Sequence, residues 1–197
     1  MSKEQDVFVL ADRALLRVVN QIKDNQWDLD AASIPSMGSS VHTLRDIVNR
    51  HVYDDMWVPE TLAGKTIAEV GDKYEGDLLG DDPKATFAST VATAVKAVEA
   101  LSESDLSKSV HLTYGDFPVR EYLKHITMFR GFRAYTIAKF IGVDSTLPDD
   151  LVQGLWDEIV PEVENWRSMG VFGPAIEVPN DADPQTKLLG LTGFLQK

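Results

Sequence analysis

One arginine stands out among the residues of this sequence that could do chemistry. In the helix predicted over about 118–141, Arg133 lies at the centre of an apolar stripe, and Arg130 lies toward one side of it. At about 100° per residue, the side chains within about 40° of Arg133 are Tyr122, Ile126, Phe129, Ile137 and Phe140. A guanidinium keeps its proton, so it needs a carboxylate, a carbonyl oxygen or an anionic ligand. Arg133 therefore predicts a structural ion pair, with Asp54 as the preferred partner, or a path to solvent at the end of the helices, or an anion-binding pocket.

Histidines are the second group with possible chemistry. Cysteine is absent, which leaves His, Asp and Glu as the common metal ligands and excludes disulfides, thiolate zinc sites and a cysteine nucleophile. His51 falls on the apolar face of its predicted helix with Asp55 four residues on, and Glu121 and His125 form a second pair at that spacing. These residues are either packed core and edge residues or displaced metal ligands. His111 is predicted to be a solvated residue near a strand edge.

Composition limits the function classes further. The chain has 197 residues, 44% of them apolar, which predicts a single domain over 1–197 with its own core. Nineteen Lys and Arg against thirty-one Asp and Glu give a net charge of −12, which disfavours nucleic-acid and membrane-surface partners. No apolar run near the N-terminus is long enough for a signal-peptide core or a membrane span, so we expect a cytoplasmic protein. No general nucleotide-binding or hydrolase motif is complete.

Helical periodicity dominates the elements that must position these side chains. Four long helices are predicted over about 6–22, 43–63, 83–101 and 118–141. Thr43 is the expected N-cap of the second helix, Asp82 with Pro83 begins the third, and Gly142 ends the fourth. The pattern predicts an all-α fold, an up-down helical bundle with short connections.

Shorter elements surround these four helices. A further helix is predicted over about 149–169 with a kink at Pro161, packed outside the four helices together with the C-terminal arm. Short helices are expected after Thr66 and after Asp183-Pro184. The alternation of residues 110–114 predicts a strand, and Gly115-Asp116 is the predicted turn after it.

Several segments, in order along nearly the whole chain, resemble one known family. They are Thr43-Leu-Arg-Asp-Ile-Val-Asn, Met56-Trp-Val-Pro-Glu-Thr-Leu-Ala-Gly64, Gly80-Asp-Asp-Pro83, Gly115-Asp-Phe-Pro-Val-Arg-Glu-Tyr-Leu123, and Phe172-Gly-Pro174 through Asp181-Ala-Asp-Pro-Gln-Thr186. Together they resemble DinB-like proteins related to the mycothiol-dependent maleylpyruvate isomerase N-terminal domain. The resemblance implies an antiparallel four-helix bundle, here with an extra C-terminal helix and arm. It also implies one divalent metal, held by a His of the second helix and an acid and a His of the later long helix.

Residue by residue, the resemblance places the three metal-ligand positions at Arg50, Phe129 and Arg133. None of these side chains is a metal ligand, and two of them are cations. The family's Pro-Cys-x-Gly-Trp segment before the second helix corresponds to residues 38–42, Gly-Ser-Ser-Val-His. Two arginines near one place repel a divalent cation and attract carboxylate, sulfate or phosphate, unless Asp54 neutralises Arg50.

Three hypotheses follow for function. The first is a metal-free DinB-like bundle without a cofactor that binds a small anionic molecule, or only packs, with Arg50, Arg133, Arg130 and Asp54 as pocket residues. The second is a transferase or isomerase that acts on a low-molecular-weight thiol such as mycothiol, with zinc or nickel bound by the displaced ligands His51, Glu121 and His125. The third is a structural subunit of a homodimer, which would expose a large apolar patch on one helix face.

Overall fold

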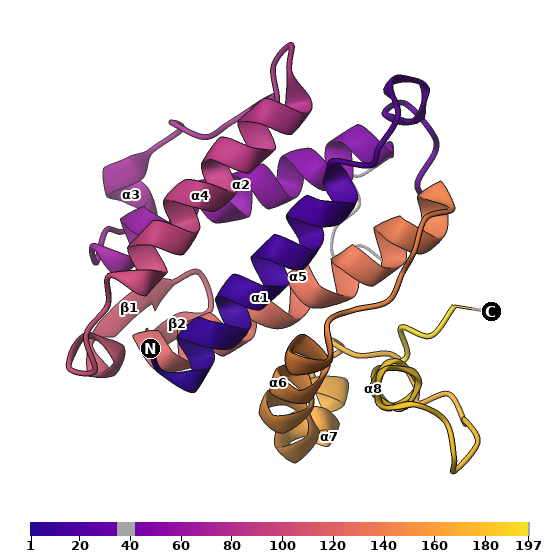
Figure 1. Ribbon diagram of the computed structural model, residues 1–197. Helices are drawn as coiled ribbons and strands as arrows, with labels where there is room; N and C mark the ends of the chain where they lie inside the picture. Colours follow the sequence, from indigo (N-terminus) through magenta and orange to yellow (C-terminus); the bar gives the residue numbers. More distant parts are fainter. Residues whose placement is uncertain (35–41, 197) are drawn as a thin grey trace.

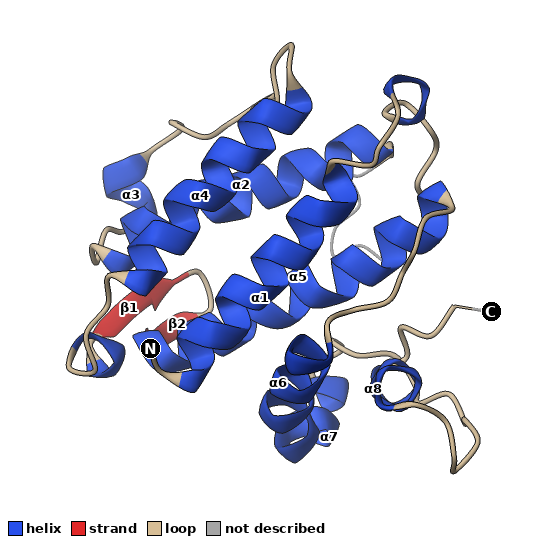
Figure 2. Ribbon diagram, in the orientation of Figure 1, coloured by secondary structure: helices blue, strands red, loops and turns tan. Residues whose placement is uncertain are grey.

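The computed structural model describes residues 1–34 and 42–196 of the chain, and this part is mostly helical (Figure 2). In chain order the elements are α1 (Lys3–Val19), η1 (Asp24–Gln26), α2 (Leu44–Leu62), α3 (Ile67–Val70), α4 (Pro83–Glu99), η2 (Asp105–Ser107), β1 (Ser109–Leu112), β2 (Gly115–Pro118), α5 (Val119–Ile141), α6 (Asp149–Ile159), η3 (Val160–Glu162), α7 (Val163–Ser168) and α8 (Pro184–Thr192). The all-α class is confirmed. Residues 38–41, part of the segment compared with the family's Pro-Cys-x-Gly-Trp, lie outside the described residues.

Capping explains why α2 and α4 begin where the sequence predicts, whereas α1 begins at Lys3, behind a capping box at Ser2, rather than at about residue 6. Thr43 accepts a hydrogen bond from the backbone N–H of Asp46, whose carboxylate accepts from the N–H of Thr43, so α2 begins with a capping box. Asp82 caps α4 by accepting a hydrogen bond from the backbone N–H of Ala85, with Pro83 as the first helical residue. Gly142, with φ +73°, ends α5 in the left-handed conformation that glycine adopts without steric cost.

Helix α1 is the central packing element of the fold. It packs against α5 and α4, while α2 packs against α4 (Figure 1). Helix α6 packs outside these four, on α1 and α5, and α8 packs against α6, as predicted for the C-terminal part. The buried apolar side chains form one continuous cluster from Val7 in α1 to Leu189 in α8.

Two of the predicted elements differ from the structure. The helix predicted over 149–169 is not one kinked helix but α6, the 3-10 turn η3 and α7. Pro161 lies in η3, where it lacks the N–H that would continue the α-helical hydrogen bonding. The predicted turn at Gly115-Asp116 is wrong as well, because Leu112 pairs with Gly115 and both turn candidates belong to β2. Thr113 and Tyr114 connect the strands, a two-residue loop that is the shortest hairpin connection.

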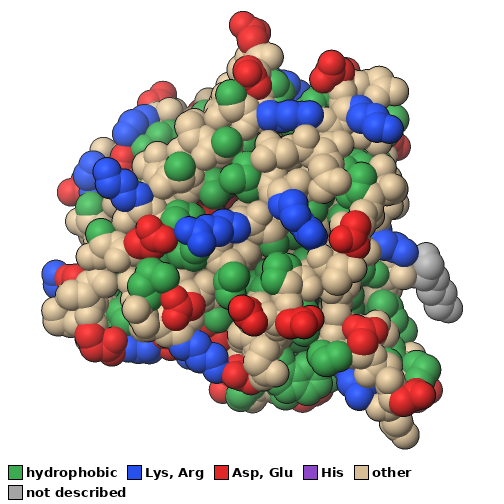
Figure 3. All heavy atoms as spheres, in the orientation of Figure 1, with side chains coloured by type: hydrophobic (Ala, Val, Ile, Leu, Met, Phe, Trp, Pro, Cys, Tyr) green, Lys and Arg blue, Asp and Glu red, His purple; other side chains and the backbone are tan. Residues whose placement is uncertain are grey.

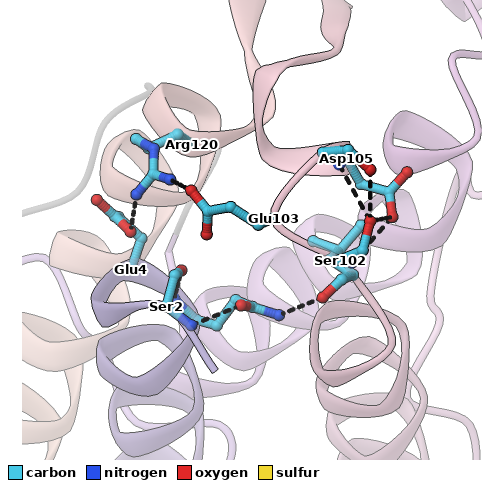
Figure 4. Close-up of polar contacts among 9 residues, drawn as sticks. Ser2, Glu4, Ser102, Glu103, Asp105 and Arg120 are labelled. Atoms are coloured by element: carbon cyan, nitrogen blue, oxygen red, sulfur yellow. Dashed lines mark hydrogen bonds and ion pairs between the residues drawn. The ribbon is translucent and has the colours of Figure 1, made fainter.

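Polar contacts fasten the start of α1 to the segments around it (Figure 4). The side chain of Gln5 donates hydrogen bonds to the carbonyl oxygens of Val98 and Leu101. Arg120 at the start of α5 reaches both Glu4 in α1 and Glu103 in the connection after α4. These contacts join three chain segments at one end of the molecule, beside the β1–β2 hairpin.

The face of the molecule seen in Figure 3 carries side chains of both charges. Acidic and basic side chains alternate with apolar ones over the face seen in Figure 3. Among the described residues, the model contains no helix with both the length and the apolar character needed to cross a bilayer.

Candidate functional site

A cavity of about 350 Å³ lies between α2 and α5, and we call it the α2/α5 cavity. The β1–β2 hairpin and the start of α3 contribute further walls. Its lining residues are Ile47, Arg50, His51, Tyr53, Asp54, Trp57, Thr61, Ile67, His111, Leu112, Thr113, Tyr114, Tyr122, His125, Ile126, Phe129, Arg130 and Arg133. All four predicted pocket residues and all three positions that the resemblance assigns to metal ligands are among them.

Arg130 forms the floor of this cavity and is the most deeply buried of its arginines. Its Nε atom donates to Oδ1 of Asp55 at 3.0 Å and lies 2.6 Å from Oδ1 of Asp12 in α1. Its Nη1 atom donates to the carbonyl oxygen of Ile126 at 2.9 Å. The side chains of Arg130, Asp12 and Asp55 are at most 3% exposed, so Arg130 links α1, α2 and α5 inside the core.

The two carboxylates around Arg130 have raised pKa values. Burial raises the pKa of Asp55, and burial together with the charge of Asp55 raises the pKa of Asp12 well above its ordinary value. The Arg130 charge opposes both shifts. One guanidinium facing two buried carboxylates is therefore fully compensated, and Arg130 has no positive charge to spare for a ligand.

Arg133, one turn further along α5, has a different environment. Its Nε atom donates to Nε2 of His51 at 3.2 Å. Burial lowers the pKa of Arg133 to about 10, with the charge of Asp54 opposing the shift, so the side chain is still a cation at neutral pH. The apolar stripe on which the sequence centres Arg133 thus faces the cavity, and its members Ile126, Phe129 and Tyr122 line it.

His51 is fixed as a neutral imidazole by this contact. Burial lowers its pKa well below 6.5, and the charges of Arg133, Arg130 and Arg50 lower it further. Because a guanidinium N–H can only donate, Nε2 of His51 is the acceptor and Nδ1 carries the proton. This Nδ1–H group is buried and has no hydrogen-bond partner among the described residues. His51 therefore lines the cavity as a neutral ring held by Arg133.

Arg50 and Asp54 form an ion pair at the outer part of the cavity. The Nε atom of Arg50 lies 3.2 Å from Oδ1 of Asp54, and the guanidinium also lies over the ring of Tyr53, 4.7 Å from its centroid. Asp54 is the predicted partner of Arg133; the structure pairs it with Arg50, while its charge also reaches Arg133. Burial raises the pKa of Asp54, and the Arg50 charge opposes this.

His125 lies at the opposite end of the cavity in a chain of polar contacts. Its Nδ1 atom is 3.2 Å from the Tyr114 hydroxyl, and its Nε2 atom is 3.4 Å from Oε1 of Glu121. The ring also contacts the edges of Phe117 and Trp166. Burial lowers the pKa of His125 despite the charge of Glu121, so the ring is neutral at pH 7.

The displaced-ligand set is only partly brought together. His51 and His125 line the same cavity, but Glu121 does not line it and contacts His125 from outside. In the part of the chain that the structure describes, no three His, Asp or Glu side chains are grouped so that they could hold one metal ion. His111 also lines the cavity, half-exposed as predicted, with its Nδ1 atom 2.7 Å from Asp116.

Several residues of the site escape sequence reasoning. Trp57 and Tyr114 line the cavity, and the buried indole N–H of Trp57 has no hydrogen-bond partner in the described structure. Tyr114 belongs to the hairpin connection, whose position over the helices is a tertiary feature. Asp12 had a signal in the sequence, because it shares the apolar face of α1 with Phe8 and Leu15, one turn to either side.

No family model matches this chain, and searches of the curated proteins and of the solved structures also find no match.

Proposed function

We propose that this protein is a DinB-like antiparallel four-helix bundle, built from α1, α2, α4 and α5, that binds a small anionic molecule in the α2/α5 cavity. The single observation that carries the proposal is the position of Arg50, Phe129 and Arg133. The resemblance assigns these residues to metal-ligand positions, and all three line one cavity. Two of the three are guanidinium groups, which attract anions and oppose a divalent cation.

The charges of the cavity support an anionic ligand. Three arginines line it, and Asp54 is the one carboxylate among the described lining residues. Arg130 is compensated from behind by Asp12 and Asp55, so Arg50 and Arg133 share Asp54. Apart from Arg130 and the two carboxylates behind it, the lining therefore presents two guanidinium groups and one carboxylate, an arrangement that attracts an anion.

Anion binding is tested by isothermal titration calorimetry with inorganic phosphate, sulfate and a small set of carboxylates. Arg133→Gln should weaken binding of every anion that the parent binds. The matched control is Arg13→Gln, which removes the same charge from an arginine that is 64% exposed on α1. Absence of any anion binding by the parent, or equal effects of the two variants, would contradict the proposal.

The metal-dependent thiol transferase or isomerase is the alternative function, and metal analysis distinguishes it. Protein purified without a polyhistidine tag should contain far less than one zinc, nickel or iron ion per chain, measured by mass spectrometry. A near one-to-one content would support the alternative and direct attention to His51 and His125, which both line the cavity.

A further inference from the structure

The α2/α5 cavity has two polar ends with an apolar middle. Helices α2 and α5 run in opposite directions along it, because His51 contacts Arg133, Asp55 contacts Arg130, and Thr61 interacts with Tyr122. On α5, His125 and Arg133 are eight residues apart, which at 1.5 Å per residue is about 12 Å along the helix axis. A ligand that touches both ends must be elongated.

The Arg133 end is suited to a carboxylate. Here Arg133, Arg50 and His51 line the cavity, and Asp54 is the nearby acid. At this end of the lining two guanidinium groups face one carboxylate, which a singly charged anion complements more closely than a dianion. Guanidinium groups bind carboxylates through paired N–H donors.

The middle of the cavity is suited to an aromatic or aliphatic body. Phe129 and Ile126 occupy the α5 wall between the polar ends, and Trp57 occupies the α2 wall. Leu112 of the hairpin and Ile67 of α3, half exposed in the absence of a ligand, add apolar surface at the mouth. A compact inorganic anion would leave these walls in contact with water, whereas a hydrocarbon body would cover them.

The far end presents a hydrogen-bond acceptor. Neutral His125 holds its proton on Nε2, facing the Glu121 carboxylate, so its Nδ1 atom accepts from the Tyr114 hydroxyl. The Tyr114 hydroxyl therefore donates its proton to His125, and its oxygen can still accept a hydrogen bond from a ligand. Tyr114 is 61% exposed and lines the cavity, so a ligand can reach this oxygen.

From these three zones, and resting on the proposed anion-binding function, we infer that the ligand is an elongated monocarboxylate with a ring or hydrocarbon body and a hydroxyl or N–H donor at its far end. The carboxylate binds at Arg133 and Arg50, beside the neutral ring of His51. The body packs between Trp57 and Phe129, and the donor group reaches Tyr114.

The test uses calorimetry on the full chain with a matched ligand pair, 4-phenylbutanoate and 4-(4-hydroxyphenyl)butanoate. These acids differ only in the terminal hydroxyl. Both should bind, the hydroxylated acid about 3- to 10-fold more tightly, the effect of one hydrogen bond. Tyr114→Phe should remove this difference while both acids still bind. Because the readout is a ratio between two ligands, a general structural effect of the substitution cancels.

Arg133→Gln should weaken the binding of both acids by about 10-fold or more, and Arg13→Gln should leave both affinities unchanged. Binding of phosphate without binding of either acid would overturn the inference and leave an anion site. Equal binding of the two acids by the parent would overturn the assignment of Tyr114 as the acceptor for the far end. Binding of no anion at all would overturn both the inference and the proposed function.

Discussion

Two arginines three residues apart on α5 both line the α2/α5 cavity, Arg130 at its closed, buried side and Arg133 at its more open side. Arg130 lies on the closed side, where α1 and α2 each supply a fully buried carboxylate. Arg133 lies on the more open side, where it donates a hydrogen bond to the neutral His51 and lies near Asp54, which is paired with Arg50. The residue type is the same, so its role depends on what the neighbouring helices contribute.

The pKa values of the two arginines express this difference. Burial alone would lower both. At Arg130 the charges of Asp55 and Asp12 more than offset burial, and the pKa is raised. At Arg133 the charge of Asp54 does not offset burial, and the pKa falls to about 10. A guanidinium whose pKa is lowered in the fold is one that a further anion would stabilise, which is why the more open side, and not the closed side, is suited to a ligand.

The largest expected effect comes from turning the more open side into a metal site. Replacing Arg50→His, Phe129→Glu and Arg133→His together places two histidines and a carboxylate in one cavity, with the latter two at i, i+4 on α5. We expect zinc binding with a dissociation constant near or below micromolar, about 8 kcal/mol, measured by calorimetry. The parent should not bind zinc comparably. Failure of the triple variant to bind zinc would show that the three positions do not converge as the resemblance implies.

The next largest effect is the loss of stability expected when a buried partner of Arg130 is removed. Asp55→Ala leaves Arg130 short of one buried partner and should lower the free energy of unfolding by about 3–5 kcal/mol in urea denaturation. Asp54→Ala is the neighbouring comparison. The sequence predicts Asp54 as the buried ion-pair partner, but its side chain is 33% exposed against 1% for Asp55, so we expect Asp54→Ala to lower the free energy of unfolding clearly less. Equal losses would contradict the distinction between the two sides.

A third prediction concerns Glu158, a largely buried acid whose charge is not balanced by a buried ion pair like that of Arg130. Burial and the charges of Glu4 and Glu121 raise the pKa of Glu158 to about 8, against the opposing charges of Lys124 and Lys3. Because this pKa is raised in the fold, the associated stability is complete below the ordinary value of 4.5 and is lost as pH rises toward 8. Glu158→Gln should therefore match the parent at pH 4 and exceed its stability at pH 9 by about 2 kcal/mol, after allowance for partial exposure.

Thermal or urea unfolding across pH measures the Glu158→Gln difference. Asp157→Asn is the matched control, since it removes an acid from the adjacent position of α6. The Lys3 and Gln153 side chains lower the pKa of Asp157, so its variant should show no gain at pH 9. A gain in both variants would indicate a general effect of net charge rather than a property of Glu158.

The smallest effect is expected at the arginine of the more open side. Arg133→Met keeps the apolar stem of the side chain and loses the hydrogen bond to His51, whose Nε2 atom is left in a cavity that water can enter. Stability in urea should change by no more than about 1 kcal/mol. A loss as large as that of Asp55→Ala would mean that Arg133 is a structural residue, and the contrast between the two arginines would disappear.

The sequence predicts helices well here and their partners poorly. Helix starts follow from local signals such as Thr43 and Asp82, which act on backbone groups within three residues. The helical spacing of the residues also predicts that Arg130, Arg133 and His51 face the core. It cannot rank Arg130 as the more deeply buried arginine, because the carboxylate of Asp12 comes from a helix more than a hundred residues earlier in the chain. The hairpin turn fails for a similar reason: strand register, and not the Gly-Asp dipeptide, decides which residues form the loop.

The pairing of α1 with α5 also has a consequence during protein synthesis. The Glu4–Arg120 ion pair joins residues 116 positions apart. At about 5–20 residues per second, a ribosome needs roughly ten seconds to deliver α5 after α1 has been made. Through that interval the apolar stripe of the nascent α1 lacks its main partner and is a target for chaperones and for aggregation. Asp12 interrupts the stripe with a charge in the meantime, so the carboxylate that later anchors Arg130 serves first as a gatekeeper for the waiting helix.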